Sequence, residues 1–263
     1  MSKTIVRFLG HTSVLIEHSG LQVIFDPNFS NKIPFIKRKS PAVFDPFALH
    51  KTNVILYSAG CHHRLNTLSL RYFKQSTQII MPMGLSKFVG DFFSFRISEL
   101  KGGAEKQISD CNIKAVKSLN KSSRFPQWNA GNCLNYILRW PDFTVLYVGE
   151  SSYDGSYFHE LGSEHKIDLA ILPIDHVGPD AQALNKHMTP TQALQAFLDL
   201  NAKKMIPNCF GAFNWSKRDE QKFLEAFKTE VASLQLQEKI FMLSPGENLE
   251  LNDEIIVSQQ ETA

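Results

Sequence analysis

Four side chains that could do chemistry follow one another in this chain without a spacer. Cys61, His62, His63 and Arg64 combine a thiol, two imidazoles and a guanidinium, which can serve as nucleophile, base, metal ligand or anion partner. They follow Val54–Tyr57, a short apolar run bounded by turn-forming residues, which predicts a buried strand. Because ligands of α/β sheets bind beyond the carboxyl ends of strands, this stretch predicts a functional loop.

Composition places this loop in a large folded chain with little net charge. The 263 residues are 43% hydrophobic, enough for a sizeable core, and 28 Lys and Arg residues stand against 26 Asp and Glu residues. This balance argues against nucleic acid as a partner. No apolar run reaches the roughly 18 residues of a membrane span, and the start lacks the apolar core of a signal peptide, so we expect a cytoplasmic chain without a transmembrane segment.

The four cysteines predict free thiols rather than a disulfide framework. Cys61, Cys111, Cys133 and Cys209 lie far apart in the chain and include no CxxC pair.

The segments around the loop alternate between strand and helix patterns. Three apolar runs with tight turns, at 5–9, 13–17 and 21–25, predict a β-meander at the edge of a sheet. Further strands are expected at 54–57, 78–81, 95–100, 105–108, 111–118, 133–138, 143–148, 167–173, 203–206 and 240–243. Helices are expected at 65–73, 86–93, 153–161, 191–200 and 219–232. This order predicts two β layers with helices outside them.

Two details refine that expectation. Thr189 is a suitable N-cap for the helix at 191–200, with Pro190 at the first helical position. The tail after Asn252 is expected to fray. No repeat or linker divides the chain, which predicts a single domain over residues 1–263.

Motifs at several strand ends resemble the metallo-β-lactamase superfamily. Gly10–Ile16 is similar to the family's Gly-His-x-x-Val-Leu-Ile, and Asp26–Ser30 is similar to Asp-Pro-x-Phe-Ser. The closest likeness is to the branch that includes N-acyl-phosphatidylethanolamine-hydrolysing phospholipase D and ascorbate-phosphate lactonase. The resemblance covers roughly residues 5–230. It implies an α/β fold of the metallo-β-lactamase kind, a four-layer αβ/βα sandwich.

The metal ligands of that branch are largely replaced in this chain. The branch carries Ser-His-x-His-x-Asp-His after the strand, where the side chains hold two metal ions. When Ser58 is laid on the family serine, Ala59, Cys61, His63 and Arg64 stand where the family has His, His, Asp and His. At the family's remaining ligand positions, the resemblance places Asn120, Glu150 and Cys209. Alanine cannot ligate, arginine repels cations and asparagine is a weak ligand for a soft metal. We therefore expect no dinuclear centre and well under one equivalent of zinc or iron.

Three interpretations of the altered loop remain open. In the first, the chain is a binding protein or pseudoenzyme in which Arg64 fills the pocket and pairs with Glu150 first and Asp175 second. The pocket candidates are then Arg64, Asn120, Asp175, His176 and His187. In the second, it is a metal-dependent hydrolase of phosphodiesterase or lactonase type, with one zinc ion on Cys61, His63, Glu150 and Cys209. In the third, catalysis is metal-free, with Cys61 or Cys209 as nucleophile and His63, His176 or His187 as base.

The segment 31–47 indicates the kind of ligand. It mixes four basic residues with apolar and proline residues, so it could meet a small molecule with a phosphate group or a lipid-like ligand. A solvated loop with a few anchoring aromatic residues is the other interpretation. The sequence predicts no oligomeric state.

Overall fold

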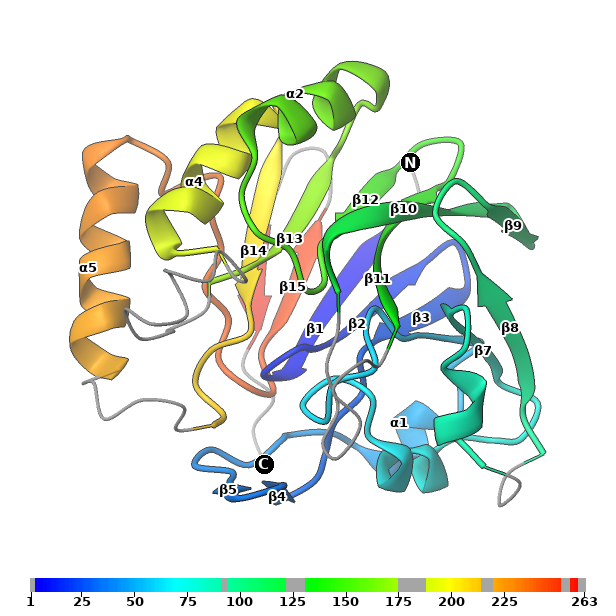
Figure 1. Ribbon diagram of the computed structural model, residues 1–263. Helices are drawn as coiled ribbons and strands as arrows, with labels where there is room; N and C mark the ends of the chain where they lie inside the picture. Colours follow the sequence, from blue (N-terminus) through cyan, green and yellow to red (C-terminus); the bar gives the residue numbers. More distant parts are fainter. Residues whose placement is uncertain are drawn as a thin grey trace.

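Two mixed β-sheets lie face to face, and helices cover their outer sides (Figure 1). The computed structural model describes residues 3–90, 94–121, 131–174, 188–213, 220–251 and 256–259. The order of layers is the αβ/βα sandwich that the family resemblance implied, with the two β layers that the strand and helix patterns predicted.

The first sheet has eight strands in the order β16-β15-β1-β2-β3-β6-β7-β8. Its bounds are β1 Thr4–Gly10, β2 Ser13–His18, β3 Leu21–Phe25, β6 Val54–Leu56, β7 Gln78–Pro82, β8 Arg96–Leu100, β15 Asn248–Leu251 and β16 Ile256–Gln259. Strands β1 to β3 form the predicted antiparallel meander, and β3, β6, β7 and β8 run parallel. The meander lies inside the sheet, not at its edge, because β15 and β16 pair beyond β1.

The C-terminal part corrects two expectations. The expected fraying is wrong for 256–259, because β16 pairs antiparallel with β15. The expected strand at 240–243 is also wrong, since Ile240 makes only an isolated bridge to Met205 within the described residues. The C-terminal strand lies instead at 248–251, between β1 and β16, and its alternating burial is the period-two pattern of a half-buried strand.

The second sheet has six strands in the order β14-β13-β12-β11-β10-β9. Its bounds are β9 Glu105–Ile108, β10 Cys111–Lys121, β11 Asn132–Arg139, β12 Thr144–Tyr147, β13 Leu169–Pro173 and β14 Lys204–Asn208. Strands β9 to β12 are antiparallel, and β12, β13 and β14 are parallel. A separate two-stranded hairpin joins β4, Lys32–Ile33, to β5, Ile36–Lys37.

Helices cover the outer face of each sheet, as the two outer apolar clusters show. Over the second sheet lie α2 Gly155–Glu164, α4 Pro190–Asp199 and α5 Glu220–Ser233. Over the first lie α1 Pro46–Leu49 and two 3-10 helices, η1 Thr67–Tyr72 and η2 Ser86–Phe88. The helices expected at 65–73 and 86–93 are therefore shorter than predicted. Asn66 starts η1 by accepting the Ser69 N–H, and Phe73 ends it in extended backbone.

Capping at α4 follows the prediction. The Thr189 side chain accepts the Gln192 N–H, the Gln192 side chain accepts the Thr189 N–H, and Pro190 stands at the first position. This capping box satisfies two N–H groups that a helix start leaves open. No helix among the described residues is long and apolar enough to cross a membrane.

The functional loops all leave the same edge of the two sheets. The parallel strands β3 and β6 of the first sheet and β12 and β14 of the second end there, and the turn after β1 joins them. Between the sheets lies the main apolar core, including Phe25 stacked on Tyr147 with ring centroids 4.2 Å apart. The core therefore fixes the distance between strand ends from which the site is built.

Candidate metal centre and the buried charge cluster beside it

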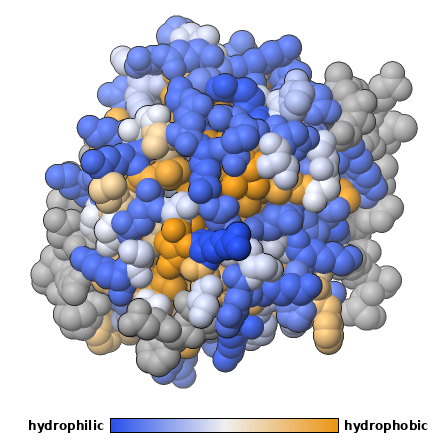
Figure 2. All heavy atoms as spheres, turned by 90° about the vertical axis from the view of Figure 1, so that its right-hand side faces the viewer, coloured by the Kyte–Doolittle hydropathy of each residue, from blue (hydrophilic) through white to orange (hydrophobic). Residues whose placement is uncertain are grey.

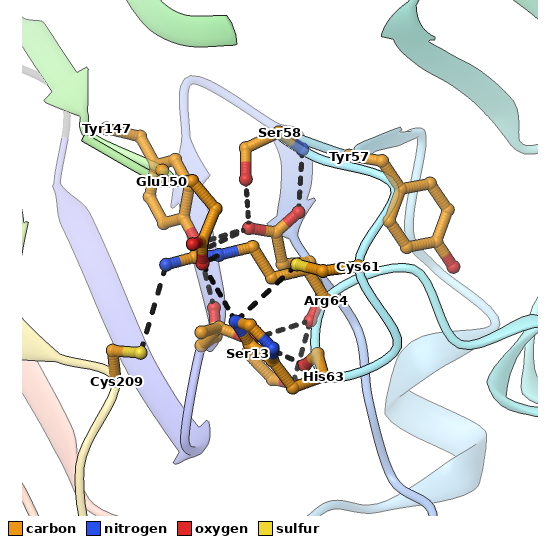
Figure 3. Close-up of polar contacts among 12 residues, drawn as sticks. Ser13, Tyr57, Ser58, Cys61, His63, Arg64, Tyr147, Glu150 and Cys209 are labelled. Atoms are coloured by element: carbon orange, nitrogen blue, oxygen red, sulfur yellow. Dashed lines mark hydrogen bonds and ion pairs between the residues drawn. The ribbon is translucent and has the colours of Figure 1, made fainter. Parts of the chain in front are cut away.

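Five loops bring one group of polar side chains together between the sheets (Figure 3). His11 follows β1, Asp26 follows β3, and the run from Ser58 to Arg64 follows β6. Glu150 follows β12 and Cys209 follows β14. Four of these loops follow strands in the parallel parts of the two sheets, namely β3, β6, β12 and β14. Parallel strands end at the same edge of a sheet, which explains why residues nearly 200 positions apart meet here.

Arg64 is the centre of a buried charge cluster. Its side chain is 0% exposed, its Nε donates to Glu150 Oε1 at 2.6 Å, and its Nη1 donates to Asp26 Oδ2 at 2.8 Å. Nη1 also lies 3.0 Å from the Tyr147 hydroxyl oxygen. Burial alone would lower the pKa of this guanidinium, but the surrounding acidic groups raise the pKa well above its ordinary value. Arg64 is therefore a permanent cation that neutralises two buried carboxylates.

Asp26 is the second member of the charge cluster, and both oxygens of its carboxylate accept hydrogen bonds from the protein. The Ser58 N–H and hydroxyl donate to it at 2.7 and 2.5 Å, and the Tyr147 hydroxyl donates at 2.7 Å. Gly149 is required nearby, because a Cβ there would lie 2.5 Å from the Ser58 side chain. The backbone of the turn after β12 therefore lies directly against the Ser58 side chain.

His63 connects the charge cluster to the thiols. Its Nε2 lies 2.8 Å from Glu150 Oε1 and 3.5 Å from Cys61 Sγ. When Nε2 carries the proton and donates it to Glu150, the ring lone pair lies on Nδ1. Burial, followed by the Glu150 charge, raises the pKa of the Cys61 thiol well above its ordinary value, so this thiol is protonated at neutral pH. A protonated thiol is a poor nucleophile.

His11 is a buried polar residue whose ring atoms have no hydrogen-bond partner. It is 1% exposed, and both ring nitrogens lack such a partner among the described residues. The ring lies edge-on to His63 at 5.4 Å and to Phe213 at 5.0 Å between centroids. Burial, helped by the charges of His63 and Arg64, lowers the pKa of His11 well below its ordinary value. His11 is therefore a neutral imidazole with open nitrogen atoms.

Two overlapping groups in this site have the composition of a metal site. His11, His63 and Cys209 have ligand atoms that all lie within 4.8 Å of one another, and so do Cys61, His63 and Glu150. The two groups share His63. Imidazole and thiolate together suit zinc, and the unpartnered nitrogens of His11 would gain a partner from an ion. The residues present therefore fit one ion.

They do not fit two ions. The buried guanidinium of Arg64 lies between Asp26, Glu150 and Cys209, with Nη2 at 3.8 Å from Cys209 Sγ. A second cation would have to share this space with a fixed positive charge, against a strong Coulomb repulsion. Ala59 offers no ligand and packs with Cys61 and Cys133 in a small apolar cluster.

The structure brings some of the predicted residues together and leaves others apart. The expected pairing of Arg64 with Glu150 is confirmed, although the guanidinium also contacts Asp26 and not one carboxylate alone. Cys61, His63 and Cys209 lie in the site. Asn120 is half-buried near the end of β10, where its N–H donates to Ser118 Oγ. Asp175, His176 and His187 lie outside the described residues.

Sequence reasoning missed His11 and Asp26. Both stood inside motifs that we took as markers of the fold, Gly10–Ile16 and Asp26–Ser30. Their position directly after an apolar run was the available signal in the sequence. The structure adds that Gly10 and His11 both have positive φ in the turn after β1. All four cysteines are free and buried thiols.

Comparison with known proteins identifies the family. Residues 5–208 match the beta-lactamase superfamily domain. The chain belongs to the metallo-β-lactamase superfamily. The resemblance of its motifs and the sandwich of its sheets are thereby confirmed.

Relatives of this superfamily member differ in length and in the names they bear. A metal-dependent hydrolase of Desulforamulus reducens is 24% identical over 251 residues, which cover 94% of this chain and 99% of that protein. An uncharacterized protein of Mycobacterium tuberculosis is 24% identical over 228 residues, and the match covers 81% of this chain and 60% of that protein. Among solved structures, a metallo hydrolase from Ignicoccus hospitalis superposes with a TM-score of 0.70 at 15% identity, covering 96% of this chain and all of that one. This last likeness shows the fold.

Proposed function

We propose that this protein is a metal-dependent hydrolase with a single-ion centre, in which the buried arginine takes the place of a second metal ion. Relatives that match nearly the whole chain bear the name of metal-dependent hydrolases, which supports the hydrolase class. The ligands we propose are His11, His63 and Cys209, with Glu150 and Cys61 beside them. This set adds His11 to the sequence-based set and places Cys61 and Glu150 beside the ion instead of on it. It also replaces the expectation of well under one equivalent of metal with one ion per chain.

The observation that carries the proposal is the state of His11. Leaving a buried polar group without a partner costs roughly 1–3 kcal/mol, and proteins avoid it unless another group completes the site. His11 also adopts a left-handed backbone conformation at φ 58°, which few residues other than glycine accept without strain. A strained, unpartnered imidazole that faces a second imidazole and a thiol is best explained by an ion that all three bind.

The charge cluster has a defined role in this proposal. Arg64 holds Glu150 through Nε, and Glu150 in turn accepts from His63 Nε2, so the guanidinium orients the histidine through one carboxylate. Such outer partners fix the tautomer and direction of a ligating imidazole. Because Arg64 is fully buried, it acts as a positioning residue and does not touch substrate.

The chemistry we propose is hydrolysis of a phosphodiester or a lactone. A bound divalent ion supplies a Lewis acid for a phosphoryl or carbonyl oxygen. The proposed ligands would hold that ion in place. The apolar walls formed by Ala59 and Phe213 limit the access of bulk water. Cys61 stays protonated at neutral pH and is not assigned a nucleophilic role.

A binding protein without turnover is the second candidate. The observation in its favour is the same buried Arg64, whose guanidinium occupies the space of the second metal ion that a dinuclear hydrolase uses. In that case the site would retain its charge cluster and bind a ligand without converting it. Activity assays separate the two candidates.

The test is hydrolysis of bis(p-nitrophenyl) phosphate and of a simple aromatic lactone by purified protein. We expect turnover that a chelator abolishes and that zinc restores. His11→Ala and His63→Ala should each lower kcat at least tenfold, since either change removes a ligand. His159→Ala, an exposed histidine on α2, is the matched control and should keep full activity. Turnover of neither substrate at any zinc concentration, with the protein folded, would favour the binding protein.

A further inference from the structure

We propose that the surface formed by the β4–β5 hairpin, α1 and η1 docks this protein on an anionic lipid membrane. We call this region the docking surface. Its elements span 32–37, 46–49 and 67–72, and β4, β5 and α1 all lie in the lower part of the molecule in Figure 1. The inference does not depend on whether the site binds a metal ion.

Charge is distributed very unevenly along the chain, and the segment that carries the docking surface is rich in basic residues. Residues 27–90 hold nine of the 28 Lys and Arg residues but one of the 26 Asp and Glu residues. Apart from the buried Arg64 and the half-buried Arg38, the basic residues of this segment are exposed. The single acid, Asp45, caps α1 by accepting the Phe47 N–H. Lys32, Lys37 and Arg71 lie within the elements of the docking surface, and no acidic residue does. The docking surface is therefore basic in a chain whose net charge is only +2.

Large apolar side chains stand out from the docking surface. Phe35 at the tip of the hairpin is 88% exposed, Phe47 on α1 is 79% exposed and Leu68 on η1 is 65% exposed. These are the three most exposed large hydrophobic side chains among the described residues. Seen from the side of β7 and β8, apolar residues reach the surface among hydrophilic ones (Figure 2). Apolar tips surrounded by lysines are the pattern of a protein that lies on a membrane interface.

The apolar tips are presented by a rigid support. Ile33 of the hairpin is buried against Ala212 and Phe213, and the Arg38 guanidinium stacks on the Phe213 ring at 4.7 Å. Phe44 stacks on Phe29 at 4.1 Å and meets Tyr72 of η1 edge-on at 4.9 Å between centroids. The exposure of Phe35, Phe47 and Leu68 is therefore a property of the folded surface and not of a loose loop.

A cavity opens on the docking surface next to the metal centre. Its volume is about 380 Å³, and its lining includes Lys32, Phe35, His62 and Leu68. His62 precedes His63, whose ring lies in the metal centre, so the cavity and the site share one loop. A membrane seated on this surface would place anionic headgroups at the mouth of the cavity.

The mixture of side chains favours lipid over nucleic acid. Nucleic-acid sites usually combine arginines with exposed aromatic residues on which bases stack. Arg71, the arginine within the elements of this surface, already lies over the Tyr72 ring at 4.9 Å, and the exposed apolar tips include the aliphatic Leu68. Lysine stems and apolar tips can enter the headgroup layer while the ammonium groups meet lipid phosphates. Charge complementarity thus points to an anionic bilayer.

The test is co-sedimentation with vesicles of phosphatidylcholine alone and of an equimolar phosphatidylcholine–phosphatidylglycerol mixture. We expect binding to the anionic vesicles that added salt weakens. Lys32→Glu/Lys37→Glu should lower that binding at least about tenfold, because each lysine near an anionic surface contributes roughly fivefold. Phe35→Ser/Phe47→Ser should lower it by about tenfold or more through lost apolar burial. Both pairs change exposed side chains, so the thermal midpoint should stay the same.

Leu234→Ser/Lys228→Glu is the matched control, since it removes one exposed apolar and one basic residue from the α5 side of the molecule. The control should bind anionic vesicles like the native protein. Absence of binding to anionic vesicles would overturn the proposal, and so would equal losses in the control and in the docking-surface variants. Retention of a single-stranded oligonucleotide but not of vesicles, abolished by the same variants, would assign the surface to nucleic acid and also overturn it.

Discussion

Replacing Arg64 by methionine tests the charge cluster directly. The change keeps most of the side-chain volume and removes the cation that faces Asp26 and Glu150. Both carboxylates then remain between the sheets without their counter-charge, and the Tyr147 hydroxyl loses one contact. Because Arg64 and Asp26 are each 0% exposed, water cannot replace the lost partner without opening the core.

The expected cost follows from the burial of the pair. Removing one partner of a fully buried ion pair destabilises proteins by about 3–5 kcal/mol. Domains of this kind are stable by about 5–15 kcal/mol, so the variant should lose roughly a fifth or more of its stability. With roughly 2–4 °C per kcal/mol for a chain of this size, the thermal midpoint should fall by about 6–20 °C.

The assay is urea unfolding at pH 7 of four proteins: native, Arg64→Met, Asp26→Asn and the double variant. The stability lost by the double variant should be about 2 kcal/mol less than the sum of the two single losses. The reason is that the amide that replaces the Asp26 carboxylate needs no counter-charge. Arg64→Lys keeps a positive charge but not the fork of donors, and it should fall between native and Arg64→Met. A loss below about 1 kcal/mol for Arg64→Met, or strict additivity in the cycle, would refute the pairing.

Two further predictions concern neighbouring residues. Gly149→Ala should lower stability by about 1–3 kcal/mol in urea unfolding, because its Cβ would meet the Ser58 side chain at 2.5 Å; an unchanged midpoint would show that the turn can move. For metal-free protein, the folded-state pKa of His11 lies below the unfolded value near 6.5, so its contribution to stability is complete above that pH. As the pH drops below that value, the free energy of unfolding should fall by up to about 1.4 kcal/mol per pH unit. His11→Gln should make the dependence of the unfolding free energy on pH flatter in this range. Equal slopes in the two proteins would contradict the burial of a neutral His11.

Much of the fold could be predicted because local patterns decide it. Strand β2 and its neighbours show continuous apolar runs between turn residues. The start of α4 at Thr189-Pro190 is capped by residues that lie close together in the sequence. The failures lie where tertiary packing outweighs a local pattern. The segment at 65–73 is periodic enough for an α-helix, yet packing of Phe73 against Phe29 holds its end in extended backbone.

The site could be predicted only at positions that match motifs of the family. Arg64 and Glu150 were connected through matching motif positions, and the ion pair between them is present. His11 could not be found in this way, because its importance depends on being left without a partner beside His63 and Cys209. The position of His11 after a strand is visible in the sequence. The lack of a hydrogen-bond partner for its ring nitrogens arises only when three loops pack together, so it cannot be read from any one of them.

The metal content of the purified protein tests the central claim most directly. Mass spectrometry of the native protein, after exposure to zinc and removal of loosely bound ions, should give one equivalent per chain. His11→Ala and Cys209→Ser should each fall well below one equivalent, while the control His159→Ala should keep one. Two tightly held ions in the native protein, or one ion that persists in both His11→Ala and Cys209→Ser, would contradict a single-ion centre built on His11, His63 and Cys209.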